Sequence, residues 1–161
     1  MPKIFFLVFM LFVSAGAHAQ PKADVPVYNF EGLQPLLQKG NDTTYVVNFW
    51  ATWCKPCVAE LPAFEALNQK YRDEKVKVLL VSLDFIKNYQ SHLLPFITDK
   101  NLQSQVVLLN DPRSHEWIDK VSPQWSGAIP ATLIYRNDQR TFYERSFTLD
   151  QLEAEVQKFI K

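Results

Sequence analysis

The stretch YVVNFWATWCKPCVAELP, residues 45–62, joins an apolar run, two cysteines and the start of a helical pattern. Tyr45 to Trp50 is β-branched and aromatic with one polar residue, Asn48, which is typical of a strand buried on both faces within a sheet. A helix is predicted from Pro56, because proline is tolerated in a first turn and apolar residues then recur at helical spacing. These apolar positions are Val58, Leu61, Phe64, Leu67 and Tyr71. The order of strand and helix therefore places Cys54 at the mouth of the helix.

Cys54 and Cys57 are the only two cysteines of the chain. A helix N-terminus presents unpaired N–H groups and the positive end of the dipole, and both stabilise a thiolate. Two intervening residues across a helix start also bring the sulfurs to bonding distance, so one thiol can attack a partner's disulfide and the other can resolve the mixed disulfide. We expect Cys54 to attack the partner's disulfide. Cys57 lies inside the first turn of the helix, and we expect it to be more buried and to resolve the mixed disulfide. Lys55 adds positive charge beside the attacking sulfur, Pro56 stiffens the turn, and both shift the redox poise of the pair.

The segment FWATWCKPCVAELP resembles the active site of the thioredoxin superfamily, specifically of its secreted TlpA/ResA-like branch. The later segment SGAIPATLIY, Ser126 to Tyr135, resembles the cis-proline loop and following strand of that family. The resemblance implies an α/β thioredoxin fold, with a central mixed β-sheet flanked by helices and an extra helix-strand insertion after the second long central strand. It also implies a thiol-disulfide oxidoreductase in which Pro130 is the cis-proline and Ile129 lines the substrate groove.

The first nineteen residues have the features of a secretory signal peptide. Met1-Pro-Lys3 is positively charged, Ile4 to Val13 is an apolar run, and Ala17 with Ala19 gives an A-x-A pattern. This predicts cleavage before Gln20 and export to the periplasm or another exported location, where disulfides persist. The alternative is an uncleaved membrane anchor, although the apolar run is too short to span a bilayer comfortably. The chain is thus divided into a signal peptide, residues 1–19, and one thioredoxin-like domain, residues 20–161.

The length of the chain after the signal peptide predicts one domain that is large enough to bury a core. The 17 basic and 17 acidic residues cancel, so nucleic acid is not an expected partner. Two cysteines are too few for a disulfide scaffold, which normally needs several bridges. A small inert disulfide remains the structural alternative to a redox pair.

Periodicity and turn residues predict alternating strands and helices after the signal peptide. Strands are expected at Val27 to Phe30, Tyr45 to Trp50, Val76 to Leu83, Val106 to Leu109, Ala131 to Tyr135 and Arg140 to Phe147, the last of them a charged edge strand. Helices are expected at Leu33 to Lys39, from Pro56, at Tyr89 to Thr98, at Ser114 to Val121 and from Thr148. Pro95 kinks or breaks its helix, and Thr148 with Gln151 fits a capping box.

Glu60 falls three residues after Cys57 and hence on the same face of the predicted helix. It could accept a proton from Cys57, or raise the pKa of the thiols by like charge. From the spacing alone, a solvated surface glutamate is the alternative, and the resemblance favours a functional acid at this position. Asn48 stands where thioredoxin itself carries a buried acid, which leaves Glu60 as the one nearby carboxylate that the sequence nominates.

Trp50, Trp53 and Trp125 are candidates for an apolar surface around Cys54 that receives partner proteins. Trp53 is the stronger surface candidate and is expected in the substrate groove, whereas Trp50 fits the core equally well. No metal is expected, because His92 and His115 lack metal-ligand spacing with the cysteines. No cofactor is expected either, beyond the redox-active disulfide of the cysteine pair.

The function that the resemblance implies is an exported, monomeric oxidoreductase that exchanges disulfides with other exported proteins. It would act as a reductant in cytochrome c maturation or general thiol reduction, recharged by a membrane-bound electron donor. One alternative is an oxidant that donates disulfides, and Lys55 favours this alternative more than a glycine at the same position would. Another alternative is a binding domain without catalytic activity. A peroxidase is disfavoured, because the signature is a Cys-x-x-Cys pair and not a lone peroxidatic cysteine.

Overall fold

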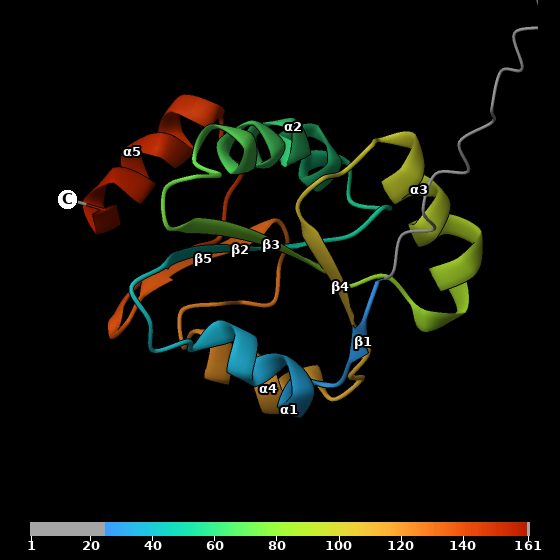
Figure 1. The fold of residues 1–161 in the computed structure, drawn as a ribbon. Helices are drawn as coiled ribbons and strands as arrows, with labels where there is room; N and C mark the ends of the chain where they lie inside the picture. Colours follow the sequence, from blue (N-terminus) through green and yellow to red (C-terminus); the bar gives the residue numbers. More distant parts are fainter. Residues whose placement is uncertain (1–24, 161) are drawn as a thin grey trace, which may run out of the picture.

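The computed structural model describes residues 25–160, which form a six-stranded sheet with helices on both faces (Figure 1). The strands are β1 (Val27–Tyr28), β2 (Thr44–Trp50), β3 (Val76–Ser82), β4 (Gln105–Leu109), β5 (Ala131–Arg136) and β6 (Gln139–Tyr143). Their order in the sheet is β1-β4-β3-β2-β5-β6. The first four strands in this order are parallel, whereas β5 is antiparallel to both β2 and β6. The predicted mixed α/β sheet is confirmed, and the predicted signal peptide lies outside the described residues.

The helices are α1 (Phe30–Leu33), η1 (Gln34–Leu37), α2 (Lys55–Lys70), η2 (Ile86–Asn88), η3 (Tyr89–Leu93), α3 (Leu94–Asp99), α4 (Ser114–Val121) and α5 (Leu149–Ile160). Figure 1 shows α2 and α5 over one face of the sheet and α1 and α4 under the other. The segment from η3 to β4 follows β3, and β4 lies between β3 and β1 in the sheet. This segment is the helix-strand insertion that the resemblance implies.

Two apolar cores lie on opposite faces of the sheet, because successive side chains of a strand point to opposite sides. Val46 and Leu80 belong to the core shared with α2, α3 and α5. Val47 and Leu79, their neighbours in sequence, belong to the core shared with α1 and α4. All seven residues of β2 are buried, so this strand is covered on both faces, as its composition predicts.

The first helix begins at Phe30, three residues earlier than the sequence predicts, and the first strand is correspondingly shorter. The side chain of Asn29 caps this helix by accepting a hydrogen bond from the Gly32 amide at 3.0 Å. An N-cap at Asn29 ends the extended segment, which the pattern of apolar residues alone does not reveal.

The predicted helix over residues 89–98 changes from the π-helical η3 to the α-helical α3 at Leu94, with no non-helical residue between the two. Pro95 lies in the first turn of α3, and the chain stays helical through it, so the alternative of a break at Pro95 is wrong. The edge strand β6 ends at Tyr143, earlier than predicted. Glu144 turns instead to the loop before β5, where its carboxylate accepts hydrogen bonds from the Ser126 amide and hydroxyl, both at 2.7 Å.

Candidate redox site

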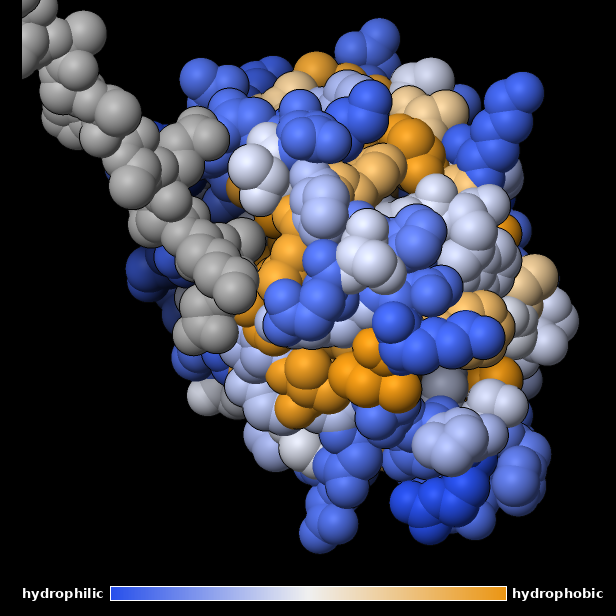
Figure 2. All heavy atoms as spheres, turned by 90° about the vertical axis from the view of Figure 1, so that its right-hand side faces the viewer, coloured by the Kyte–Doolittle hydropathy of each residue, from blue (hydrophilic) through white to orange (hydrophobic). Residues whose placement is uncertain are grey.

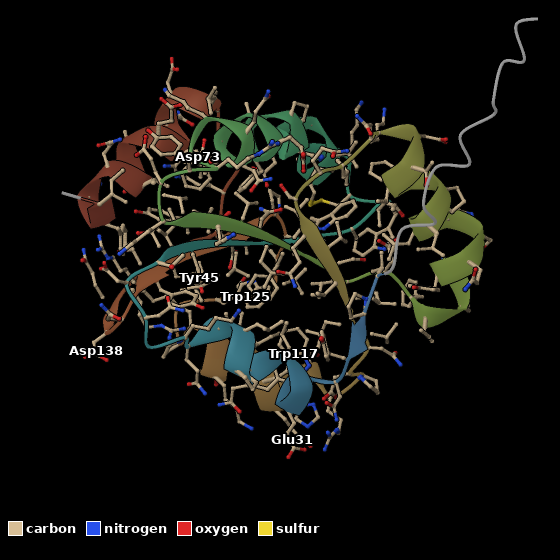
Figure 3. The ribbon with its side chains drawn as sticks, in the orientation of Figure 1. Glu31, Tyr45, Asp73, Trp117, Trp125 and Asp138 are labelled. Carbon is tan, nitrogen blue, oxygen red and sulfur yellow. A yellow bond between two sulfur atoms is a disulfide. The ribbon has the colours of Figure 1, made fainter. Side chains whose placement is uncertain are left out.

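Cys54 and Cys57 form a disulfide at the N-terminus of α2, drawn as a yellow bond in Figure 3. Cys54 is the N-cap of the helix, and its Sγ accepts a hydrogen bond from the Cys57 amide at 3.3 Å. Pro56 occupies the first turn, where its missing N–H leaves no intrahelical bond unmade. Cys54 keeps 6% of its surface exposed, whereas Cys57 is fully buried. A reacting group from outside can therefore reach the first sulfur far more readily than the second.

The loop before β5 lies against the exposed sulfur. The Ile129–Pro130 peptide bond is cis, as the resemblance implies, and the Ile129 carbonyl oxygen is 3.8 Å from Cys54 Sγ. A sulfur in a disulfide carries no proton to donate, so this contact becomes a hydrogen bond only when Cys54 is a thiol. Trp53 is 58% exposed, which confirms the prediction that it is a surface residue. Lys55 is exposed directly beside Cys54 in the sequence, and it places a positive charge at this edge of the sheet.

Glu60 is buried, with 4% of its surface exposed, so the alternative of a solvated surface glutamate is wrong. Its carboxylate accepts hydrogen bonds from Asn48 Nδ2 at 2.9 Å and from the Phe147 amide at 2.8 Å. Burial raises the pKa of Glu60 from 4.5 to about 7, although these two bonds and the charge of Arg145 act in the opposite direction. Glu60 is therefore a carboxyl group that can gain or lose a proton near neutral pH.

Asn48 and Phe147 are partners of Glu60 that the sequence interpretation did not identify. The Asn48 side chain also donates a hydrogen bond to Thr132 Oγ1 at 3.2 Å. A single amide in a wholly buried strand was the available signal, because a buried polar group needs a hydrogen-bond partner. Phe147 contributes a backbone amide, which no side-chain pattern could indicate.

The other two tryptophan candidates belong to the cores and not to the surface around Cys54. Trp50 is fully buried on the α2 side and packs against Phe96, with ring centroids 5.5 Å apart. Trp125 is buried under the sheet near Trp117, as Figure 3 shows, with ring centroids 5.7 Å apart. Its indole N–H donates to the Ala128 carbonyl at 2.7 Å, so it packs beneath the loop that leads to the cis-proline.

Asp84 is a residue of the site that the sequence analysis did not identify. Its buried carboxylate accepts hydrogen bonds from the Thr52 amide at 3.0 Å and from the Thr52 hydroxyl at 2.5 Å. The Ser82 hydroxyl donates to it as well, at 2.8 Å. Asp84 thus joins the end of β3 to the turn that carries Cys54. An acidic residue directly after an apolar strand was the available signal.

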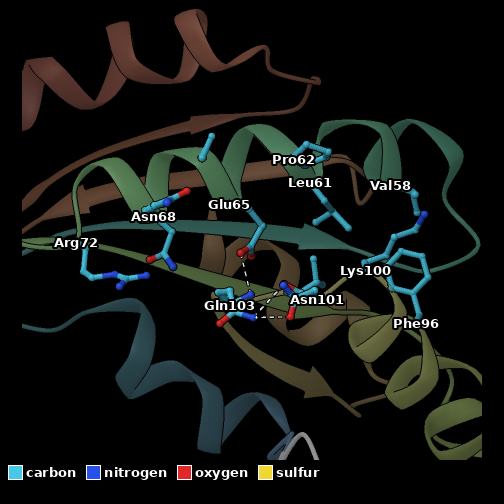
Figure 4. A pocket seen from close by; sticks show the side chains of 13 residues that line it. Val58, Leu61, Pro62, Glu65, Asn68, Arg72, Phe96, Lys100, Asn101 and Gln103 are labelled. Atoms are coloured by element: carbon cyan, nitrogen blue, oxygen red, sulfur yellow. Dashed lines mark hydrogen bonds between the residues drawn. The ribbon is translucent and has the colours of Figure 1, made fainter. Parts of the chain in front are cut away.

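A cleft beside α2 is separate from the disulfide. It has a volume of about 600 Å³ and lies between the outer face of α2 and the segment from Phe96 to Gln103 (Figure 4). Glu65 crosses its floor, and its carboxylate accepts hydrogen bonds from the amides of Gln103 at 2.8 Å and Ser104 at 3.1 Å. Neither cysteine lines this cleft. The hydrogen bonds of Glu65 attach α2 to the inserted segment.

Two further observations concern ions and membranes. Within residues 25–160, no three His, Cys, Asp or Glu side chains are grouped closely enough to hold a metal ion. No helix in the same range combines the length and the apolar character that a membrane crossing requires.

Comparison with known proteins places these features in a family. The sequence profile of the AhpC/TSA family matches residues 20–140, which is most of the chain and includes both cysteines, Glu60 and Pro130. The chain belongs to the AhpC/TSA family. This membership, the Cys-x-x-Cys disulfide and the mixed sheet agree with the thioredoxin-like fold that the sequence predicts.

Curated proteins similar to this chain are named as thioredoxin-like or as thiol-disulfide oxidoreductases. The chain is 38% identical to the thioredoxin-like protein YneN of Bacillus subtilis over 89 residues, which cover 55% of this chain and 52% of YneN. It is 49% identical to the thiol-disulfide oxidoreductase ResA of Oceanobacillus iheyensis over 39 residues, 24% of this chain and 20% of ResA. The chain therefore spans at most about half the length of these two relatives.

A solved structure shares the fold. It is a secreted Mycobacterium tuberculosis disulfide oxidoreductase, described as homologous to Escherichia coli DsbE, with a TM-score of 0.54 and 25% identity. The similarity covers 76% of this chain and 84% of that protein.

Proposed function

We propose that this protein is a thiol-disulfide oxidoreductase that reduces disulfides in other exported polypeptides through Cys54 and Cys57. The observation that carries the proposal is the disulfide at the N-terminus of α2, with one reachable sulfur and one fully buried sulfur. This asymmetry is what a pair with an attacking and a resolving cysteine requires. The names of the relatives, and the word secreted in the name of the mycobacterial protein, support the same chemistry and location.

In the reducing direction, the Cys54 thiolate attacks one sulfur of the substrate disulfide. The substrate S–S bond breaks as a new bond to Cys54 forms, and the departing sulfur takes the electron pair and then a proton. The Cys57 thiolate next attacks Cys54 Sγ and releases the second substrate sulfur as a thiolate, which takes the second proton. Two electrons and two protons pass to the substrate, and the Cys54–Cys57 disulfide is left. A dithiol electron donor at the membrane must then reduce this disulfide by the same exchange.

Other residues at the site support these steps. The N-terminus of α2 and the charge of Lys55 stabilise the Cys54 thiolate. Glu60, one turn beyond Cys57 with a pKa of about 7, serves as the acceptor for the proton that Cys57 must lose. Trp53, Ile129 and Pro130 form the groove for the substrate chain. Residues 1–19 serve as the signal peptide, and the mature protein acts as a monomer.

Replacing the resolving cysteine tests the exchange mechanism. We expect Cys57→Ser to accumulate mixed disulfides between Cys54 and exported proteins, because the first attack still occurs and the second cannot. Non-reducing electrophoresis and mass spectrometry of the trapped species measure this. Cys54→Ser is the matched control and should trap at least about tenfold less, since the remaining sulfur is fully buried. Equal trapping by both variants, or none by either, would refute the assignment of Cys54 as the attacking residue.

The reduction potential of the pair decides the direction of electron flow. We expect a value near that of thioredoxin, about −270 mV, measured by equilibration with thiol buffers and tryptophan fluorescence. A value near about −120 mV would contradict a reductant and would indicate disulfide donation. The separation is large, because about 30 mV corresponds to a tenfold change in the exchange equilibrium.

A further inference from the structure

Large apolar side chains are exposed at the edge of the sheet that carries the disulfide. Trp53 is 58% exposed, Phe85 60% and Ile86 47%, and none of them belongs to either core. Trp53 follows the C-terminal end of β2, and Phe85 and Ile86 follow the C-terminal end of the neighbouring strand β3. Figure 2 views the molecule from the side to which these strand ends point and shows apolar residues gathered between hydrophilic ones. Exposed apolar groups that are grouped in this way are typical of a contact surface.

Hydrogen bonds hold the two loops together. Both oxygens of the Asp84 carboxylate bind Thr52, one of them the Thr52 amide and the other the Thr52 hydroxyl. Trp53 and Phe85 are the residues that directly follow this bonded pair, and Cys54 is the residue after Trp53. The two loops that carry the exposed side chains are therefore held together beside the turn that carries Cys54, so binding need not order their backbones first.

The charge beside these residues is positive. Lys87 Nζ lies 5.6 Å from the centroid of the Phe85 ring, and Lys55 is exposed beside Cys54. Over residues 50–56 and 83–92 the one carboxylate is Asp84, which is buried and bonded to Thr52. Among residues 25–160, no carboxylate comes within 4.0 Å of Lys55 or Lys87, as the ion pairs of the described chain show.

We propose that Trp53, Phe85, Ile86 and Lys87, here called the Phe85 patch, bind the polypeptide segment beside the target cysteine of a substrate. The patch selects segments in which an apolar residue and a carboxylate lie next to that cysteine. Apolar contacts supply the affinity, and the lysine charges supply the preference for an acidic partner. The inference rests on the proposed function, because it presupposes that Cys54 exchanges disulfides, and it adds the class of substrate.

The test uses synthetic peptides that carry one cysteine in a disulfide with a fluorescent reporter thiol. The residues beside the cysteine are Leu-Glu, Leu-Lys or Ser-Glu, and oxidised glutathione serves as a substrate without a flanking segment. Rates of reporter release by the reduced protein are measured at low and at high salt. At low salt we expect Leu-Glu to react about threefold faster than Leu-Lys, and high salt should reduce this ratio. We expect Leu-Glu to exceed Ser-Glu by up to about tenfold.

Variants separate the two parts of the patch. Lys87→Glu should reverse the order of Leu-Glu and Leu-Lys, and Phe85→Ser should remove the advantage of Leu-Glu over Ser-Glu. Lys120→Glu is the matched control, because Lys120 also lies over an aromatic ring, that of Phe30, but on α4. It should leave all the rate ratios unchanged.

The outcomes distinguish a failure of this inference from a failure of the proposed function. Equal rates for the three peptides, with reduction still occurring, would overturn the inference and leave the proposed function standing. No release from any peptide and no reduction of glutathione would refute the proposed function, and the role of the patch with it. A dimer of the wild type that Phe85→Ser dissociates in sedimentation would also overturn the inference, because the patch would then be a contact between two copies.

Discussion

Glu60 joins three parts of the protein through one carboxyl group. It lies on α2 and accepts hydrogen bonds from the side chain of Asn48 on β2 and from the amide of Phe147, just before α5. The sequence was sufficient to nominate Glu60, because the spacing from Cys57 is local and a helix fixes the face. The partners lie 12 and 87 residues away, and contacts at such separation depend on how helices and strands pack. The depth of burial, which raises the pKa, therefore could not be predicted.

Glu60→Gln should change how the stability of the oxidised protein depends on pH. In the wild type the folded pKa is about 7 and the ordinary value is 4.5, so the folded state binds this proton more tightly than the unfolded state. The contribution to the free energy of unfolding is greatest below about pH 4.5 and is lost as pH rises to about 7. The difference corresponds to about 3 kcal/mol, which the variant should not show.

Urea unfolding of both proteins between pH 4 and 8 measures this difference. The variant can still make two hydrogen bonds: its oxygen accepts from the Phe147 amide, and its NH₂ group donates to Asn48 Oδ1 once the Asn48 amide turns over. Glu74→Gln, at an exposed position, is the control for a change of net charge. If the wild type and Glu60→Gln gave parallel curves of stability against pH, the assigned pKa would be wrong.

Local sequence signals predicted the helices and strands better than the hydrogen bonds that join them to one another. The helix over residues 114–121 is confirmed at both ends, and the Thr148–Gln151 capping box forms before α5. The link through Asp84 was not predicted, because a carboxylate after a strand shows no preference among the loops that it could bind. Its target, Thr52, is 32 residues away and becomes a neighbour only when β2 and β3 pair.

Asp84→Ala should destabilise the protein by about 2–4 kcal/mol, because it leaves the Thr52 amide and two hydroxyl groups without their acceptor. Asp84→Asn should cost less, since its oxygen can still accept from the Thr52 amide while its NH₂ group donates to the Thr52 hydroxyl. Urea unfolding at neutral pH measures both variants. Asp73→Ala, at an exposed position, is the control, and an Asp84→Ala variant as stable as this control would show that the link contributes nothing.

The whole molecule consists of two cores that share one sheet. The nearly unbroken apolar run of residues 45–50 predicted a strand covered on both faces, and the resemblance supplied the helix-strand insertion. The pattern could not assign Trp50 and Trp125, because a large aromatic residue near a strand end fits a core and a surface equally well. Their positions depend on the loops and helices that cover them, which are α3 for Trp50 and the segment around Ala128 for Trp125.

The two cores should unfold in one transition, because every central strand contributes side chains to both. Leu80→Ala removes a fully buried side chain from the α2 side, and Leu133→Ala removes one from the α4 side. Each should lower the free energy of unfolding by about 2–5 kcal/mol. Trp50→Phe silences the tryptophan fluorescence of the core on the α2 side, the double variant Trp117→Phe/Trp125→Phe silences that of the core on the α4 side, and circular dichroism reports on the whole chain. Midpoints that differ between these probes in a single variant would show that the cores unfold separately.

The position of β1 in the sheet also has a consequence during synthesis of the chain. Val27 and Tyr28 pair with Leu108 and Leu109, and the Phe30 amide donates to the carboxylate of Asp111, 81 residues further on. At ordinary rates of translation, a ribosome needs on the order of ten seconds to add that many residues. During this interval the first strand has no mate, although β2, β3 and the helix between them are already complete. The first strand of the sheet therefore reaches its final place only after β2, α2 and β3, which all follow it in the chain.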